Sequence, residues 1–233
     1  MVSATGKINK LIPPQVRNDR SGIIMADAKK IARLLLKKYP EPRIALNFGN
    51  PLELLVATIL SAQCTDKRVN EVTEVLFRKY RSARDYAEAD PKRFEQDIRA
   101  INFYKNKARQ IINCCRTLVE RYGGEVPDSL EKLTELPGVG RKTANVVLGS
   151  AFGKPAIPVD THVLRVSNRL GLADSKKPEE VEAALMKQLP EKLWTPFTLA
   201  MILHGRQTCK AKRPLCKECI LYEECQWPEK PPR

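Results

Sequence analysis

The chain has 233 residues, with 41 Lys or Arg against 27 Asp or Glu and a formal net charge of +14. Hydrophobic residues make up 42% and charged residues 29%, a globular composition that argues against a disordered chain. No apolar run approaches the roughly 20 residues of a membrane span, and we expect no secretion signal. The charge predicts a polyanionic partner, with nucleic acid favoured over an anionic membrane surface.

Residues 1–22 are polar and basic and lack a helical period, so we interpret them as a flexible extension, with a targeting arm as the weaker alternative. Beyond them, apolar residues recur at helical spacing, and Pro, Asp and Gly mark the ends. This pattern predicts helices over 25–38, 51–60, 66–76, 91–98, 105–122, 130–136, 141–152, 160–170, from 178 onward, and 194–204. In the third, Asp66 is expected to be the cap, and the apolar face to carry Val69, Val72, Val75 and Leu76. No stretch alternates with period two, so the predicted fold class is all-α.

A short turn between two predicted helices carries the sequence Leu136-Pro-Gly-Val-Gly140. Gly138 and Gly140 allow a sharp turn and a close approach to another chain. The helix that follows offers free N–H groups and the positive end of its dipole, which suit a phosphate. The pattern indicates a helix-hairpin-helix that binds the DNA backbone. A tight turn between two packed helices is the alternative.

Lys142 falls in the first turn of the helix after this turn. A cation there opposes the helix dipole, and Arg141 beside it adds like-charge repulsion. Both effects favour a neutral amine, as would partial burial, and a neutral amine can form a Schiff base. The alternative is a solvated lysine that contacts a phosphate.

Asp160 precedes another predicted helix, in the sequence Val159-Asp-Thr-His162. The simplest role for Asp160 is an N-cap, and for His162 a local hydrogen bond in the first turn. Capping does not exclude catalysis, because one carboxylate oxygen can cap while the other faces a cleft. Near Lys142, such a carboxylate could accept a proton or stabilise positive charge at a sugar carbon.

Four of the seven cysteines crowd into 17 residues, as Cys209, Cys216, Cys219 and Cys225. Four thiolates in so short a loop can bind one zinc ion or one [4Fe–4S] cluster. Only one pair has the two-residue spacing of a zinc knuckle, so the spacing favours the cluster, and zinc stays open. The loop also carries four basic residues that could contact phosphates: Lys210, Lys212, Arg213 and Lys217.

Taken together and in order, these motifs closely resemble the endonuclease III family of the helix-hairpin-helix DNA glycosylase superfamily. The segments that carry the resemblance are Leu136 to Val147, Val159 to His162, Ser61-Ala-Gln-Cys-Thr-Asp66 and the cysteine loop. The match runs from about Met25 to the C-terminus. It implies a base excision repair enzyme with glycosylase and AP lyase activity on oxidised pyrimidines in duplex DNA.

The resemblance also implies roles for single residues. Lys142 would attack C1′ of the damaged nucleotide and form a Schiff base, and Asp160 would be the catalytic carboxylate. The four cysteines of the loop at 209–225 would hold a [4Fe–4S] cluster that positions basic residues on DNA. Gln63 and Phe103 would fill the gap left by the extruded nucleotide, although Phe103 could instead be a core residue. The residues expected to contact DNA are Gln63, Phe103, Gly138, Gly140, Arg141, His162, Lys210, Lys212, Arg213 and Lys217.

The implied architecture is two helical domains that flank a DNA-binding cleft. Residues 44–154 would form a six-helix bundle with the hairpin, and residues 23–43 plus 155–233 a discontinuous helical domain with the cluster loop. The expected partner is double-stranded DNA that contains damaged pyrimidines or abasic sites. We expect no membrane association, a monomer, and a cytoplasmic location at the nucleoid.

Two other functions are compatible with many of these motifs. A mismatch or adenine glycosylase of the same superfamily would share most of these motifs, but monofunctional adenine removal has no need for Lys142. A non-catalytic DNA-binding or redox-sensing module would use the hairpin, the charge and the cluster. Such a module has no need for Lys142 and Asp160 together.

Overall fold

The computed structural model describes residues 17–18 and 24–233, so most of the extension predicted at 1–22 lies outside the described residues. Strand β1 (Arg17–Asn18) pairs antiparallel with β2 (Ile24–Met25). Strands of two residues are too short to show alternation, which is why the sequence did not predict them. All other regular secondary structure in the described residues is helical, and this confirms the all-α fold class.

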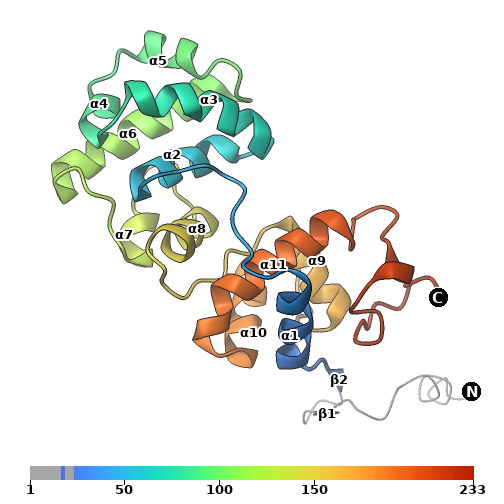
Figure 1. Cartoon of the computed structure of the whole chain (residues 1–233). Helices are drawn as coiled ribbons and strands as arrows, with labels where there is room; N and C mark the ends of the chain where they lie inside the picture. The colour runs from blue at the N-terminus through green and yellow to red at the C-terminus, as the bar shows by residue number, and fades with distance from the viewer. Residues whose placement is uncertain (1–16, 19–23) are drawn as a thin grey trace, which may run out of the picture.

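The helices follow one another along the chain and are joined by turns and loops, of which the one between α1 and α2 is long (Figure 1). They are α1 (Ala28–Lys38), α2 (Pro51–Ser61), α3 (Asp66–Lys79), α4 (Ala83–Ala87), α5 (Pro91–Asp97), α6 (Tyr104–Tyr122), α7 (Leu130–Thr134), α8 (Arg141–Ala151), α9 (Thr161–Leu170), α10 (Pro178–Gln188) and α11 (Trp194–Gln207). Two short 3₁₀ helices, η1 (Glu191–Leu193) and η2 (Cys216–Glu218), complete the helical structure of the described residues.

Side-chain caps fix several helix starts. The N-cap predicted at Asp160 is confirmed, and Asp90 caps α5. The cap of α3 is Thr65, whose hydroxyl accepts from the N–H of Arg68 at 3.3 Å. Asp66 is instead the first residue of that helix. Val75, expected on the apolar face of α3, is 68% exposed, because it lies on the side of the helix turned to solvent.

The sequence did not predict α4. Five residues are too few for a helical period, and the signal is a capping box in which Ser82 and Asp85 bond each other's backbone N–H groups. Residues 44–154 therefore contain seven helices rather than the six expected.

The buried apolar side chains fall into two clusters. The first runs from Leu46 to Ala156 and is built by α2 to α8. The second combines α1 with α9, α10 and α11 and with the C-terminal segment as far as Leu221. Figure 1 shows α1 packed beside α11, although they are more than 150 residues apart in the sequence.

Polar contacts join the two clusters. Asp66 of α3 pairs with Arg206 of α11 at 2.6 Å, and Arg141 of α8 pairs with Glu182 of α10 at 2.7 Å. Gly149 of α8 lies so close to α11 that an added Cβ would sit 2.9 Å from the Thr195 hydroxyl.

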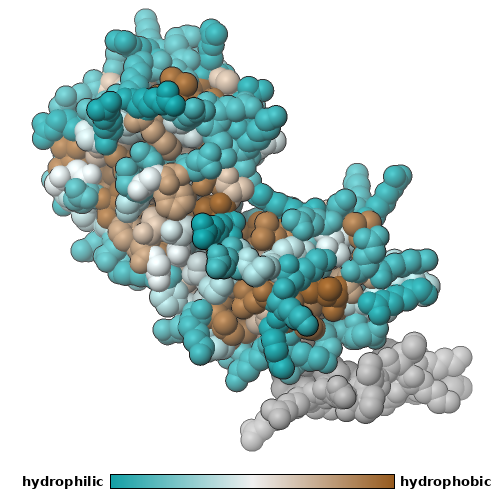
Figure 2. Space-filling model, viewed as in Figure 1, coloured by the Kyte–Doolittle hydropathy of each residue, from teal (hydrophilic) through white to brown (hydrophobic). Residues whose placement is uncertain are grey.

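Hydrophilic residues make up most of the surface on the face seen in Figure 2. No helix in residues 24–233 combines the length and apolar character that crossing a membrane requires.

Candidate active site and cysteine pocket

The predicted hairpin lies between α7 and α8. The N–H of Val139 donates to the carbonyl of Leu136 at 3.1 Å, and both side chains are buried. Gly138 has φ +78°, and a Cβ there would lie 2.9 Å from Cβ of Gln110. Gly140 is the N-cap of α8, has open space around it and adds no side-chain cap. The first N–H groups of α8 therefore face an exposed turn.

Lys142 lies in the first turn of α8, as predicted, and its side chain is exposed. The partial burial considered for its amine is therefore absent, and the neighbouring charge of Arg141 is paired with Glu182. Lys142 lines a pocket that also includes Asp160, Asn145 and Asp66. The pocket walls come from α2, α3 and α8 of the first cluster and from α11 of the second.

Asp160 caps α9 with one oxygen. Its Oδ1 accepts from the N–H of His162 at 2.8 Å and from the N–H of Val163 at 2.9 Å. Within the described residues, Oδ2 accepts no hydrogen bond, and Asp160 and Lys142 form no ion pair within 4.0 Å. The carboxylate is thus fixed by the helix start through Oδ1, and Asp160 lines the same pocket as Lys142.

His162 is half-buried against Gly205 of α11, and its Nδ1 lies 3.2 Å from Nη2 of Arg165. Burial lowers the pKa of His162 below its ordinary value, and the charges of Arg165 and Arg206 lower it further, although Asp160 opposes them. A neutral imidazole beside the pocket can exchange hydrogen bonds but adds no positive charge to a DNA-binding surface.

Gln63 and Phe103 lie on two exposed loops. Gln63 follows α2, and Phe103 is the N-cap of α6. Phe103 is 64% exposed, so the alternative of a core residue is wrong. An exposed aromatic ring has the apolar surface that stacking against bases would use.

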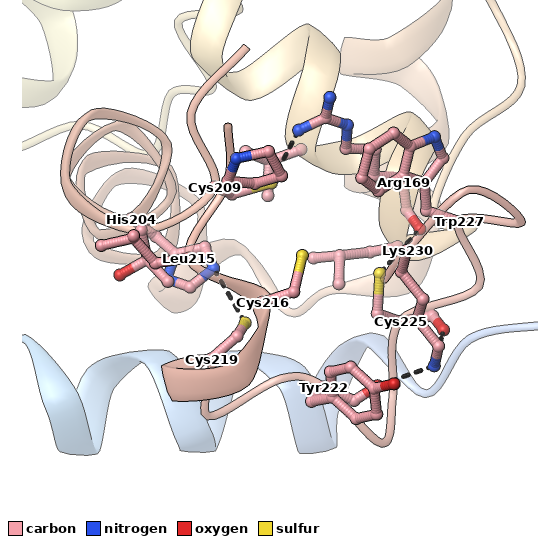
Figure 3. Close-up of a pocket in the computed structure, with 14 residues that line it drawn as sticks. Arg169, His204, Cys209, Leu215, Cys216, Cys219, Tyr222, Cys225, Trp227 and Lys230 are labelled. Carbon is pink, nitrogen blue, oxygen red and sulfur yellow. Dashed lines mark hydrogen bonds between the residues drawn. The ribbon is translucent and has the colours of Figure 1, made fainter. Parts of the chain in front are cut away.

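The four loop cysteines line one cavity, which also borders Arg169, His204, Tyr222, Trp227 and Lys230 (Figure 3). Nη1 of Arg169 lies 3.4 Å from Sγ of Cys209, and Nε2 of His204 lies 3.6 Å from Sγ of Cys219. Burial raises the pKa of the thiols of Cys216, Cys219 and Cys225. In residues 24–233, no three His, Cys, Asp or Glu side chains meet closely enough to bind one metal ion.

The four basic residues of the loop are all exposed: Lys210, Lys212, Arg213 and Lys217. The backbone around them is held by Arg169, which donates to the carbonyls of Lys210 and Ala211 at 2.9 and 3.2 Å. The guanidinium of Arg169 also stacks on the ring of Trp227, 3.9 Å from its centroid. The loop thus presents its cations from an ordered backbone.

A family model described as HhH-GPD superfamily base excision DNA repair protein matches residues 56–191. An endonuclease III of Synechocystis sp. is 49% identical over 85% of this chain and 91% of its own length. The endonuclease III of Escherichia coli K12 is 44% identical over 88% of this chain and 99% of its own.

The chain belongs to the HhH-GPD superfamily and, within it, to the endonuclease III family.

Two solved structures of endonuclease III superpose on the chain with a TM-score of 0.82 and 48% identity. One is a trapped covalent intermediate with DNA and spans 85% of this chain and 93% of that one. The other is a non-covalent complex with DNA and spans 87% and 96%. They confirm the family and the fold expected from the sequence.

Several residues of this endonuclease III family member were missed by sequence reasoning. Glu182 is 3% exposed and accepts both hydrogen bonds from Arg141, and Lys107 is 4% exposed. Arg169 and His204 contact the sulfur atoms of the loop. Each contact joins segments far apart in the chain, and no local spacing could have predicted it.

Proposed function

We propose that the chain removes oxidised pyrimidines from duplex DNA and then cleaves the strand, with Lys142 as nucleophile and Asp160 as catalytic carboxylate. The main support is that both side chains line one pocket between the two apolar clusters, next to an uncapped helix N-terminus that suits a phosphate. The covalent DNA complex of the related endonuclease III supports a covalent step.

In this mechanism, the neutral amine of Lys142 attacks C1′, and the bond from C1′ to the base breaks. The base leaves with the bonding electrons and takes up a proton. Opening of the sugar ring gives a protonated Schiff base between Nζ and C1′, which makes the C2′ proton acidic. Loss of that proton breaks the C3′–O bond on the 3′ side of the lesion, and water then releases the lysine.

Asp160 assists these steps through its free oxygen. Oδ1 is used to cap α9, so the carboxylate cannot rotate away, and Oδ2 takes part in proton transfer and stabilises positive charge at C1′. Asn145, which lines the same pocket, donates instead to Glu182 and to the carbonyl of Ile157. It supports the wall of the pocket rather than the chemistry.

We further propose that the two apolar clusters correspond to two domains, residues 44–154 and residues 23–43 plus 155–233, with the DNA-binding cleft between them. The linking segments, 39–50 and 152–160, contribute Arg43 to Leu46 and Pro158 to the pocket. The chain would act as a monomer in the cytoplasm at the nucleoid.

We propose that the cysteine loop holds a [4Fe–4S] cluster, whose four iron atoms would each take one thiolate, so the four thiols need not meet at a single ion. The donor set of the loop is four thiols around one cavity, and Arg169 can donate a hydrogen bond to a thiolate at Cys209. When bound, the cluster would cross-link the loop and supply no hydrolytic chemistry. The loop residues would then present Lys210, Lys212, Arg213 and Lys217 to DNA phosphates.

A lesion panel tests this function. Duplexes with thymine glycol, with an abasic site, or with adenine opposite oxidised guanine are incubated with the protein, and base release and strand cleavage are measured. We expect release and cleavage at thymine glycol and cleavage at the abasic site. A preference for adenine would support the mismatch glycosylase, and nicking that persists in Lys142→Ala and Asp160→Asn proteins would support the non-catalytic module.

A further inference from the structure

Two exposed loops of the first cluster carry a residue in the left-handed backbone conformation. Gln63, after α2, has φ 54°, and Phe103, before α6, has φ 58°. Residues other than glycine rarely adopt this backbone conformation, so the surrounding contacts must hold both loops in place. The sequence places these residues 40 positions apart, and only the fold brings their loops together.

Asn102 supplies a direct link between the loops. Its Nδ2 donates to the backbone carbonyl of Gln63 at 2.7 Å. Asn102 is the residue before Phe103 and is itself exposed. One side chain on the loop before α6 therefore fixes the backbone of the residue that the loop after α2 presents.

Lys107 of α6 supplies a second link, to the C-terminal end of α2. Its ammonium donates to the carbonyl of Leu60 at 2.8 Å and to that of Ala62 at 2.5 Å, at the C-terminal end of α2. A cation there satisfies carbonyls that the helix leaves unpaired and interacts favourably with its dipole. Lys107 is only 4% exposed and has no acidic partner within 4.0 Å in residues 24–233.

Phe103 is joined to the same lysine. The backbone N–H of Lys107 donates to the carbonyl of Phe103 at 3.1 Å, as the first helical bond of α6. The first turn of α6 thus holds Phe103 by its backbone and holds the end of α2 by a side chain. The two loops share these contacts and cannot shift independently.

We infer that Asn102 and Lys107 are positioning residues that hold Gln63 and Phe103 as one preassembled unit, which enters the DNA duplex when a nucleotide is extruded. The inference rests on the proposed function. Extrusion leaves a gap in the stack that costs free energy, and a rigid unit fills it without first being ordered. Each contact needed for this already exists in the protein without DNA.

Two substrates separate this role from a general structural one. The first is a duplex with one abasic site opposite a normal nucleotide. The second has the same strand annealed to a complement that lacks the opposite nucleotide, so that little stacking must be broken. The variant Asn102→Ala removes the link at an exposed position, and Asn113→Ala on α6 is the control, because its side chain also lies at the surface.

For Asn102→Ala, we expect kcat/KM on the intact duplex to fall about threefold to tenfold, the effect of one hydrogen bond, with little change on the gapped duplex. Asn102→Asp keeps the size, loses the donor and should behave like Asn102→Ala. Asn113→Ala should match wild type on both. Equal loss on both substrates, or no loss on either, would overturn the inference. Inactivity of the wild-type protein on both would instead reject the proposed function.

Discussion

Arg141 of α8 and Glu182 of α10 form a two-pronged ion pair, with Nε to Oε2 at 2.7 Å and Nη2 to Oε1 at 2.9 Å. Asn145 adds a third bond to Oε1 at 3.1 Å, and Glu182 is 3% exposed. The pair also raises the pKa of Arg141 above its ordinary value. It joins the two apolar clusters directly beside Lys142, so it helps to set the geometry of the pocket that Lys142 lines.

Removal of Arg141 should therefore leave a buried carboxylate without its counter-charge. We expect Arg141→Met to lower the free energy of unfolding by about 1–3 kcal/mol, as measured by urea denaturation. Adding Glu182→Gln should recover part of that loss, because an amide needs no counter-charge. If the single and double variants are equally stable, the pair does not hold the clusters together.

The two glycines of the hairpin should behave differently. Gly138→Ala forces a Cβ onto a residue with φ +78° and to 2.9 Å from Gln110, so it should cost about 1–3 kcal/mol of stability. Gly140 has an ordinary φ of −87° and open space, so Gly140→Ala should fold as well as wild type.

Gly140→Ala should nevertheless weaken DNA binding if a phosphate approaches that N-terminus closely. Fluorescence anisotropy with a duplex measures this, and thermal denaturation supplies the stability of each variant. Binding unchanged in Gly140→Ala would mean that the turn only connects two packed helices.

His162 predicts a pH effect on stability. Its pKa is lower in the folded protein than the ordinary 6.5, chiefly because of burial, so the unfolded chain binds more protons between the two values. The contribution of neutral His162 is complete above 6.5 and is lost as the pH falls toward the lowered value. The stability difference between wild type and His162→Gln should therefore shrink from about pH 7.5 to about pH 5. A stability difference that stays constant over this pH range would contradict the prediction.

The four loop cysteines should control iron content. Purified protein should carry about four iron atoms per chain and absorb in the visible range. Cys216→Ser and Cys225→Ser should lose most of both signals. Cys64→Ser is the matched control, because Cys64 is half-buried against the first cluster and should retain them. Zinc found in place of iron would mean that the loop binds a zinc ion and not a [4Fe–4S] cluster.

Most helices could be predicted from the sequence, because apolar spacing and caps such as Asn50-Pro51 and Asp90-Pro91 are local signals. The short α4 and the two-residue strands could not, since neither shows a period. Cys114 and Cys115 stand within the helical pattern of residues 105–122, and each is 1% exposed on the inner side of α6.

The residues of the candidate site likewise divide into those that the sequence can predict and those that it cannot. Lys142 and Asp160 stand in local motifs, so the sequence could point to both. Glu182 and Lys107 could not be found, because their partners, Arg141 and the end of α2, lie 41 or more positions away. A buried charge becomes apparent only when the fold encloses it.

Borohydride trapping tests the central claim most directly, because it reduces a Schiff base to a stable amine. Wild-type protein with an abasic duplex should give a covalent complex, and peptide mapping should place the adduct on Lys142. Lys132→Ala, at an exposed position of α7, should trap as wild type does. Lys142→Ala should give no complex. If Lys142→Ala traps as well as wild type, Lys142 is not the nucleophile.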